Sequence, residues 1–202
     1  SGTFLPGTGT VNFIGGNGVT QVVTMGTQAF NNVTLNGSGT VQLAGNTIIN
    51  GDYTNNGATL DLNNNNLTIG GNYANYNSMS GLLPGTGTVI FNKASGTQTV
   101  DQLGLDFNHI QHTGAGTLQL LNDLSTTGDI INSLGTFDAN DKIITVRNNF
   151  TNTATFTPGT GGTGEIYFEK IGGTQTLTSG GAVFQKFAHT GTGTLNLAGI
   201  VE

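Results

Sequence analysis

The 202-residue chain contains no cysteine and no tryptophan, and only 8% of its residues are charged. Without cysteine, the fold depends on no disulfide and therefore on no oxidising compartment. Five Lys and Arg against eleven Asp and Glu give a net charge of −6. This is the wrong sign for contacts with phosphates, so we expect no nucleic acid partner.

Long apolar runs are missing as well. The sequence contains no signal-peptide pattern and no run of about 18 apolar residues, so we expect no membrane span. No window of about 11 or more residues shows the 3.6-residue period of a helix. These absences leave an all-β fold as the class to examine.

Glycine, threonine and asparagine dominate the composition, with 34, 34 and 25 residues respectively. A disordered chain is typically charged and poor in β-branched residues, and this chain is neither. Short runs instead place apolar residues two apart with a polar residue between them, which is the period of a half-buried strand. Examples begin at Thr10, Thr40, Thr59, Thr117 and Thr194. Gly, Asn-Gly and Pro-Gly separate the runs and mark turns.

The stretch PGTGTV occurs at Pro6 and again at Pro84, with a looser copy at Pro158. A shift of 77 positions aligns much of the rest; Phe30, for example, falls on Phe107 and Phe184. We therefore expect one continuous repeat domain over residues 1–202. Its units run approximately over 6–83, 84–157 and, as a partial unit, 158–202.

Each PGTGTV stretch is predicted to be a corner followed by a strand. Proline presets φ for a turn, glycine supplies a positive φ, and threonine begins the strand. None of the copies continues as Gly-Lys-Ser/Thr into a helix, so a phosphate-binding loop is not indicated.

Two architectures fit this pattern: a parallel β-solenoid with three or four coils per unit, or a tandem array of small β-sandwiches. The strand phrase recurs within one unit, at Thr40 and Thr59, and a sandwich does not require such likeness between its strands. An aromatic content of 7% is also small for a module close to the lower size limit of independent folding. We therefore favour the solenoid. Its predicted core includes Val41, Leu43, Leu60, Leu62, Leu118, Leu120, Leu195 and Leu197.

The G-x-G-T-φ-x-φ phrases (φ meaning apolar), the Thr/Asn/Gly bias and the long imperfect repeat resemble the β-strand repeats of bacterial extracellular surface proteins. These include filamentous-haemagglutinin-like and autotransporter-adhesin-like β-solenoids. The resemblance implies an extracellular or cell-surface location and a role as stalk, fibre or adhesive shaft. The chain opens at Ser1 and stops within its third unit, so we expect a mature piece or fragment of something longer.

The histidines are the first candidates for chemistry. His109 and His112 have a spacing that suggests a metal site, but residues three apart on a strand point to opposite faces. His189 lies a full unit from His112, too far to share an ion. We expect no metal ligands and place the histidines in turns.

The acidic residues Asp123, Asp129, Asp138 and Asp141 are dense enough to suggest a β-helical polysaccharide-active enzyme with paired carboxylates. Asp129, however, repeats Asp52, and an active site is normally singular. We therefore expect no catalytic residues, no cofactor and no enzyme. The structural role of a fibre or stalk segment is the leading hypothesis.

A polysaccharide-binding module is the alternative, with aromatic contacts from Tyr73, Tyr76 and Phe150. Ice binding is a special case, for which the Thr-x-Thr pairs are Thr8/Thr10 and Thr86/Thr88. Neither end of the chain reads as a polar cap, so we expect copies to pair end to end or neighbouring domains to cover the ends.

Overall fold

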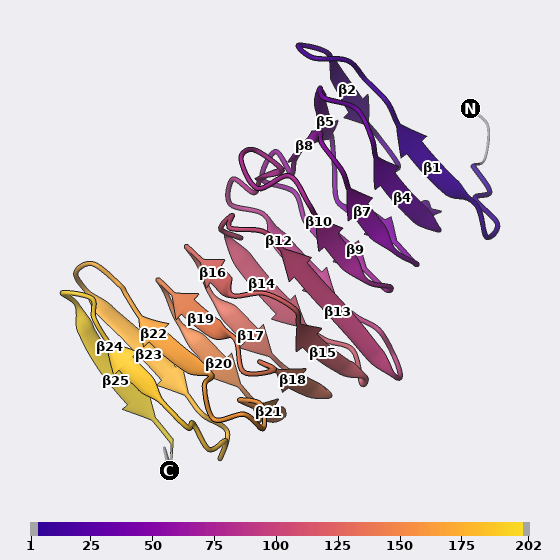
Figure 1. Cartoon of the computed structure of the whole chain (residues 1–202). Coiled ribbons are helices and arrows are strands. Elements are labelled where there is room, and N and C mark those ends of the chain that lie inside the picture. The colour runs from indigo at the N-terminus through magenta and orange to yellow at the C-terminus, as the bar shows by residue number, and fades with distance from the viewer. Residues whose placement is uncertain (1–3, 200–202) are drawn as a thin grey trace.

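The computed structural model describes residues 4–199. Those residues form parallel strands stacked as a β-solenoid of about nine turns, and they contain no helix (Figure 1). Every strand pairing is parallel and joins one coil to the next, as in Tyr53 with Tyr73. Hairpin-built sandwiches would contain antiparallel pairs, so the solenoid prediction is confirmed and the tandem sandwiches are ruled out.

Each coil crosses three faces in a fixed order. The first face is an eight-stranded sheet. It contains β1 (Thr10–Phe13), β4 (Asn32–Leu35), β7 (Tyr53–Asn55), β10 (Tyr73–Asn75), β13 (Thr97–Gln102), β15 (Thr117–Leu120), β18 (Thr136–Asp138) and β21 (Thr155–Thr157).

The second face consists of two four-stranded sheets. One contains β2 (Thr20–Val23), β5 (Thr40–Leu43), β8 (Thr59–Asp61) and β11 (Leu82–Leu83). The other contains β16 (Leu124–Thr126), β19 (Ile143–Val146), β22 (Glu165–Phe168) and β24 (Phe187–His189). In the coil between these sheets, Phe107 makes only an isolated bridge to Thr126.

The third face is a nine-stranded sheet. It contains β3 (Ala29–Phe30), β6 (Thr47–Ile49), β9 (Leu67–Ile69), β12 (Thr88–Phe91), β14 (His109–His112), β17 (Ile130–Asn132), β20 (Phe150–Asn152), β23 (Thr174–Thr178) and β25 (Thr194–Ala198).

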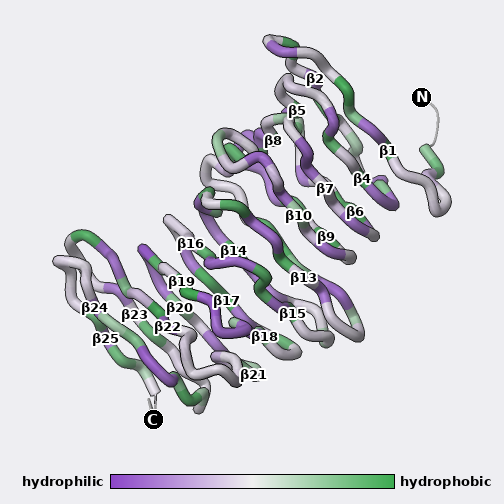
Figure 2. The backbone as a smooth tube through the Cα atoms, viewed as in Figure 1, coloured by the Kyte–Doolittle hydropathy of each residue, from purple (hydrophilic) through white to green (hydrophobic). Residues whose placement is uncertain are grey.

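Side chains alternate between the interior and the surface along these strands, as the two-residue period requires. In β15, Leu118 and Leu120 are each 1% exposed, whereas Gln119 is half-buried on the outside. Apolar and polar segments accordingly alternate along the tube in Figure 2. Aromatic rings from successive coils also meet inside, and those of Tyr53 and Tyr73 stack with centroids 5.0 Å apart.

Six of the eight predicted core residues are buried: Val41, Leu43, Leu60, Leu62, Leu118 and Leu120. The prediction was wrong for the last two. Leu195 is only partly buried, and Leu197 is 47% exposed. Both lie on β25, the last strand of its sheet, where no further described coil covers the inward-facing side chains.

The 77-residue repeat is not a whole number of coils. The equivalent strands β2, β13 and β23 lie on the second, first and third faces respectively. One unit supplies eleven strands, β1 to β11, and eleven strands at three per coil make three and two-thirds coils. Each unit is therefore turned by one face relative to the unit before it.

The PGTGTV corners form the predicted turns. The backbone N–H of Gly9 donates to the carbonyl of Pro6 at 3.1 Å, and that of Gly87 to Pro84 at 2.9 Å. Gly7 and Gly85 both have φ of 54°, a conformation that glycine adopts without steric cost. In each copy the strand begins at the second threonine, at Thr10 in β1 and Thr88 in β12.

We predict that Leu120→Asp destabilises the chain by about 3 kcal/mol or more, because an unpaired charge would be buried in the interior. The matched control is Leu134→Asp, since Leu134 is 50% exposed and should lose less than about 1 kcal/mol. Urea unfolding followed by circular dichroism measures both. Equal midpoints for the two variants would contradict the assignment of the interior.

We also predict that deletion of residues 78–154 leaves a shorter folded solenoid, because each coil depends only on its neighbours. Thr174 would then occupy sequence position 97, and β23 would move from the third face to the first. Far-UV circular dichroism and a cooperative melt check this outcome. An isolated 77-residue unit that melts at the temperature of the full chain would contradict it.

Candidate functional site

The polar side chains at the starts of strands connect the coils. Asn32 Oδ1 accepts a hydrogen bond from the backbone N–H of Asp52 at 2.8 Å, and Asp52 Oδ1 accepts one from Asn72 at 2.6 Å. Asn72 Oδ1 in turn accepts from the N–H of Thr99 at 3.0 Å. We call such a column an entry ladder. It pairs backbone donors that would otherwise lack a partner within their own coil.

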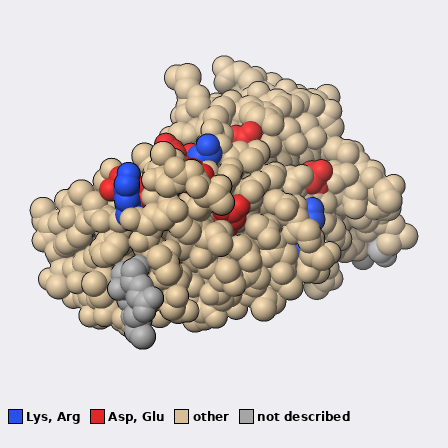
Figure 3. Space-filling view, turned by 60° about the horizontal axis from the view of Figure 1, so that its bottom comes forward, with Lys and Arg blue, Asp and Glu red and all other residues tan. Residues whose placement is uncertain are grey.

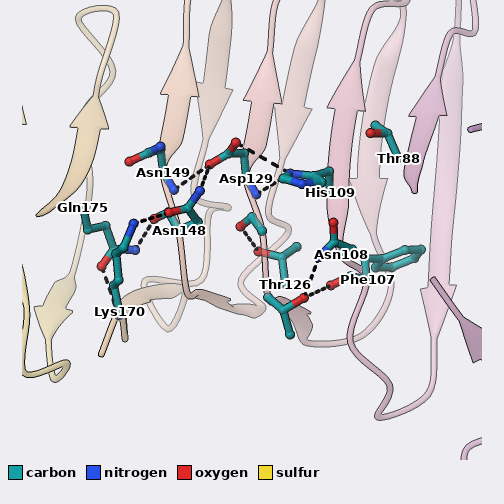
Figure 4. A network of polar contacts seen from close by, with 12 residues as sticks. Thr88, Phe107, Asn108, His109, Thr126, Asp129, Asn148, Asn149, Lys170 and Gln175 are labelled. Atoms are coloured by element: carbon teal, nitrogen blue, oxygen red, sulfur yellow. Dashed lines mark hydrogen bonds and ion pairs between the residues drawn. The ribbon is translucent and has the colours of Figure 1, made fainter. Parts of the chain in front are cut away.

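A second entry ladder repeats the first with a shift of 77 residues (Figure 4). His109 Nδ1 accepts from the N–H of Asp129 at 2.9 Å, and Asp129 Oδ1 accepts from Asn149 at 2.9 Å. Asn149 Oδ1 then accepts from Thr176 at 2.9 Å. His109 therefore takes the place of Asn32. Its Nδ1 also lies 3.6 Å from Asp129 Oδ2, but a nitrogen that accepts the N–H bond carries no proton to donate there.

Asp123 and Asp141 play the same part in other turns. Asp123 Oδ1 accepts from the N–H of Ile143 at 2.9 Å, as Asn46 does from Asn66 one unit earlier. Asp141 accepts from the N–H of Gly161 through both carboxylate oxygens, at 2.9 and 2.7 Å. That hydrogen bond holds the pKa of the Asp141 carboxyl below its ordinary value. A general acid would need the opposite shift.

Asp138 completes the set of acidic candidates. Its Oδ2 accepts from Gln119 Nε2 at 2.8 Å, as Asp61 Oδ2 accepts from Gln42 at 2.7 Å one unit earlier. All four predicted carboxylates thus contact the neighbouring coil. Equivalents at Asn46, Asp52, Asp61 and Asn64 make matching contacts. The high number of acidic residues in this part of the chain therefore reflects structural positions that recur with the repeat.

The prediction that the histidines lie in turns was wrong, because His109 and His112 are the first and last residues of β14. The expectation that they point to opposite sides is confirmed: His109 is half-exposed and His112 is 1% exposed. His189 lies at the end of β24 on another face and is exposed. The structure does not bring the three histidines together.

His112 begins a column of buried polar side chains that we call the interior ladder. Its Nδ1 lies 2.9 Å from Asn132 Oδ1, and Asn132 Nδ2 donates to Asn152 Oδ1 at 2.7 Å. Asn55 and Asn75 form the equivalent pair in the preceding unit, at 2.9 Å. Burial lowers the pKa of His112, and the hydrogen bond to Asn132 opposes that shift only in part. His112 Nε2 has no partner, so the interior holds the neutral ring.

No group of three or more His, Cys, Asp or Glu side chains that could hold a metal ion occurs within residues 4–199. Charged residues make up only 8% of the chain, and on the face shown in Figure 3 they lie in small groups separated by uncharged surface. Over the same residues, no helix is long and apolar enough to cross a membrane.

The aromatic candidates separate into core and surface. Tyr73 and Phe150 are fully buried, so the prediction that they contact a ligand at the surface was wrong. Tyr76 is 51% exposed, and the nearby side chains of Met79 and Leu83 are exposed as well. Only Tyr76 of the three could therefore contact a partner.

Threonines form outward columns through the strand pairings, and each column changes face with the unit. They are Thr20–Thr40–Thr59 on the second face, Thr97–Thr117–Thr136–Thr155 on the first and Thr174–Thr194 on the third. None of these columns runs the length of a face. The pairs Thr8/Thr10 and Thr86/Thr88 lie at corners and strand starts on different faces.

One ionic cluster was missed by the sequence reasoning. Arg147 Nη1 lies 3.1 Å from Asp106 Oδ2 and 3.0 Å from Ser125 Oγ, and Arg147 Nε lies 3.5 Å from Glu169 Oε2. One unit earlier, uncharged residues stand in the places of Arg147 and Asp106, namely Gly70 and Ala29. A search for charges outside the repeat would have found this cluster. Arg147 thus joins side chains of three other coils along the second face.

A groove of about 630 Å³ lies beside β21, the last strand of the first face. Thr155, Thr157, Asp138, Val183 and Gln185 contribute to its lining. The chain crosses the next coil here in a loop, so the side of β21 that faces away from β18 has no strand partner among the described residues.

No family model, no curated protein and no solved structure matches the chain.

We predict that the chain loses stability as the pH falls below about 6.5, because unfolding frees His112 to take up a proton that the interior disfavours. One such proton changes the free energy of unfolding by at most about 1.4 kcal/mol per pH unit. Stability is retained above this window, because the neutral ring fits the interior.

Urea unfolding from pH 8 to pH 5 measures the effect. His112→Leu should remove this part of the pH dependence, because its repeat equivalent Leu35 is fully buried at the same place. His109→Asn, which introduces the residue type of its repeat equivalent Asn32, is the control and should keep it. An unchanged slope in His112→Leu would contradict the assignment.

Proposed function

We propose that this chain is a structural repeat segment of an extracellular or cell-surface fibre, stalk or adhesin, and that it provides length and rigidity. The observation that carries the proposal is that side chains capable of catalysis or metal binding are hydrogen-bonded to neighbouring coils. The four acidic candidates and His109 accept hydrogen bonds from a neighbouring coil, and His112 pairs with Asn132 inside. Side chains bonded in this way connect successive coils of the solenoid.

Parallel pairing that continues through the first and third faces suits a shaft. Strands in adjacent coils lie about 4.8 Å apart, so nine turns span roughly 40 Å along the axis. Deforming such a rod breaks backbone pairings on three faces together with the ladders between them. The extracellular location rests on the resemblance of the strand phrases to those of bacterial surface proteins. The absence of cysteine and the net charge of −6 are compatible with it.

The partners in this proposal are copies of the chain stacked end to end, or neighbouring domains of a longer protein. Edge strands at both ends of the solenoid support it. At one end of the described solenoid β1, β2 and β3 pair on one side only, and at the other end β24, β25 and, beneath a loop, β21 do so. An unprotected strand edge is a template for pairing with another chain, and a head-to-tail contact that does not close gives a filament.

A polysaccharide-binding module is the second candidate. It is supported by the groove beside β21, whose lining mixes Thr155, Thr157 and Gln185 with small apolar residues. Binding of a soluble glycan that is lost in Gln185→Ala, with unchanged stability, would favour this candidate over the purely structural one.

The structural proposal predicts particles that grow in one dimension only. Negative-stain microscopy with light scattering over a concentration series should show rods of constant width whose length increases with concentration. Particles that stay compact and monomeric at the highest concentration would contradict end-to-end assembly. The stalk segment within a longer protein would then remain as the structural function.

A further inference from the structure

The edge strands at the two ends of the solenoid lack the charged side chains that usually keep strand edges apart. Charged side chains, especially lysine, commonly block edge-to-edge pairing. No Asp, Glu, Lys or Arg occurs between residues 4 and 51 or between residues 187 and 199. The edge strands β1, β2 and β3 therefore carry no charge, and neither do the strands β24 and β25 at the opposite end.

Both ends also expose apolar side chains. At the first end, Val11 and Phe13 on β1 are only partly buried, although their strand partners Val33 and Leu35 point into the core. At the other end, Leu197 on β25 is 47% exposed and Phe187 on β24 is 38% exposed. Pairing of the ends would bury these side chains, and burial of apolar surface favours association.

The faces of the two ends are in phase. The described chain enters the solenoid on the first face with β1 and leaves it on the third face with β25. Between β23 and β24 the chain crosses the first face at Phe184, whose ring lies 5.2 Å from that of Phe156 on β21. A second copy placed on the last described coil would therefore begin on the correct face.

The side-chain columns of the third face give the register. The outward column passes through Ala29, Ile48, Thr68, Ile90, Gln111, Ile131, Thr151, Thr178 and Ala198. Small and β-branched residues occupy both of its ends. If the same register continues across the joint, Ala29 of the next copy follows Ala198 at one strand spacing, about 4.8 Å.

We propose that two copies join head to tail without rotation about the axis, so that β3 of one copy pairs in parallel with β25 of the other and β2 pairs with β24. This joint rests on the end-to-end assembly proposed above and specifies its geometry. The first-face strand β1 of the added copy then follows the Phe184 segment.

The absence of cysteine allows a direct test by disulfide formation. Ala29→Cys and Ala198→Cys are prepared as separate single variants, mixed as full chains and oxidised. Adjacent strands bring the two Cα atoms within the range that a disulfide can bridge. We expect a mixed dimer on a non-reducing gel, at about tenfold or more over the control pair, and neither variant should cross-link when it is alone.

Ile48→Cys mixed with Ala198→Cys is the control. Ile48 lies on the same column and is 40% exposed, but it would be two strand spacings away, about 9.6 Å, which is beyond disulfide reach. Asn12→Cys and Val22→Cys report on the other faces, since β1 and β2 lie on the first and second faces.

Each outcome separates the joint from the assembly. A bond between Ala198→Cys and Ala29→Cys that exceeds all other pairs supports the joint. Filaments in which Ala198→Cys bonds instead to Asn12→Cys or Val22→Cys overturn the unrotated joint and leave end-to-end assembly intact. If neither filaments nor a mixed dimer forms, both the joint and the end-to-end assembly are overturned.

Discussion

Each coil must satisfy hydrogen bonds that its neighbour leaves open, and this constraint governs the rest of the molecule. Strands meet it through backbone pairing, but the corners leave N–H groups that no strand pairs. Side-chain oxygens of Asn and Asp one coil away accept these bonds, as between Asn32 and Asp52 or between Asp129 and Asn149. Inside, buried amides also join the coils, since Asn55 Nδ2 donates to Asn75 Oδ1 and Asn132 Nδ2 donates to Asn152 Oδ1. The composition rich in asparagine follows from this requirement.

The same constraint explains why the apparent chemical groups repeat. Each position in an entry ladder needs an acceptor within hydrogen-bond distance of a backbone N–H in the next coil. The side-chain oxygen of Asn or Asp, or the Nδ1 of histidine, can supply it. His109 therefore substitutes for Asn32, and Asp123 for Asn46, without change in the backbone bond that they accept. The three and two-thirds coils of a unit then distribute equivalent columns over three faces. Equivalent side-chain columns, such as those of threonine, therefore change face from one unit to the next.

Much of the fold could be predicted from the sequence. The two-residue alternation, the turn residues and the 77-residue shift were sufficient for an all-β solenoid, and the PGTGTV corners follow from the conformations open to proline and glycine. The face on which a strand lies could not be predicted, because it depends on the number of strands per coil and not on any local pattern. The burial of Tyr73 and Phe150 was missed for a related reason. An aromatic residue at a strand start looks the same in sequence whether it points inward or outward.

The candidate residues could be found in the sequence by their residue type, but their roles depend on contacts between residues that are far apart in the chain. The comparison of Asp129 with Asp52 indicated a structural role, whereas the bonds of Asp123 and Asp141 emerge only when residues about 20 positions apart are brought together. The bond between Arg147 and Asp106 joins residues 41 positions apart in the same way, and no short motif marks it.

The central claim is that the acidic residues hold the coils together through hydrogen bonds that they accept. Urea unfolding of a chain with Asp123, Asp129, Asp138 and Asp141 all changed to Asn tests it most directly, with the corresponding fourfold Ala variant beside it. The account predicts that the Asn variant keeps its stability within about 1 kcal/mol, because an amide oxygen accepts the backbone N–H bonds and the Gln119 amide can turn to accept from the amide at position 138, and that the Ala variant loses about 2–6 kcal/mol. Equal stability of the Asn and Ala variants would contradict it.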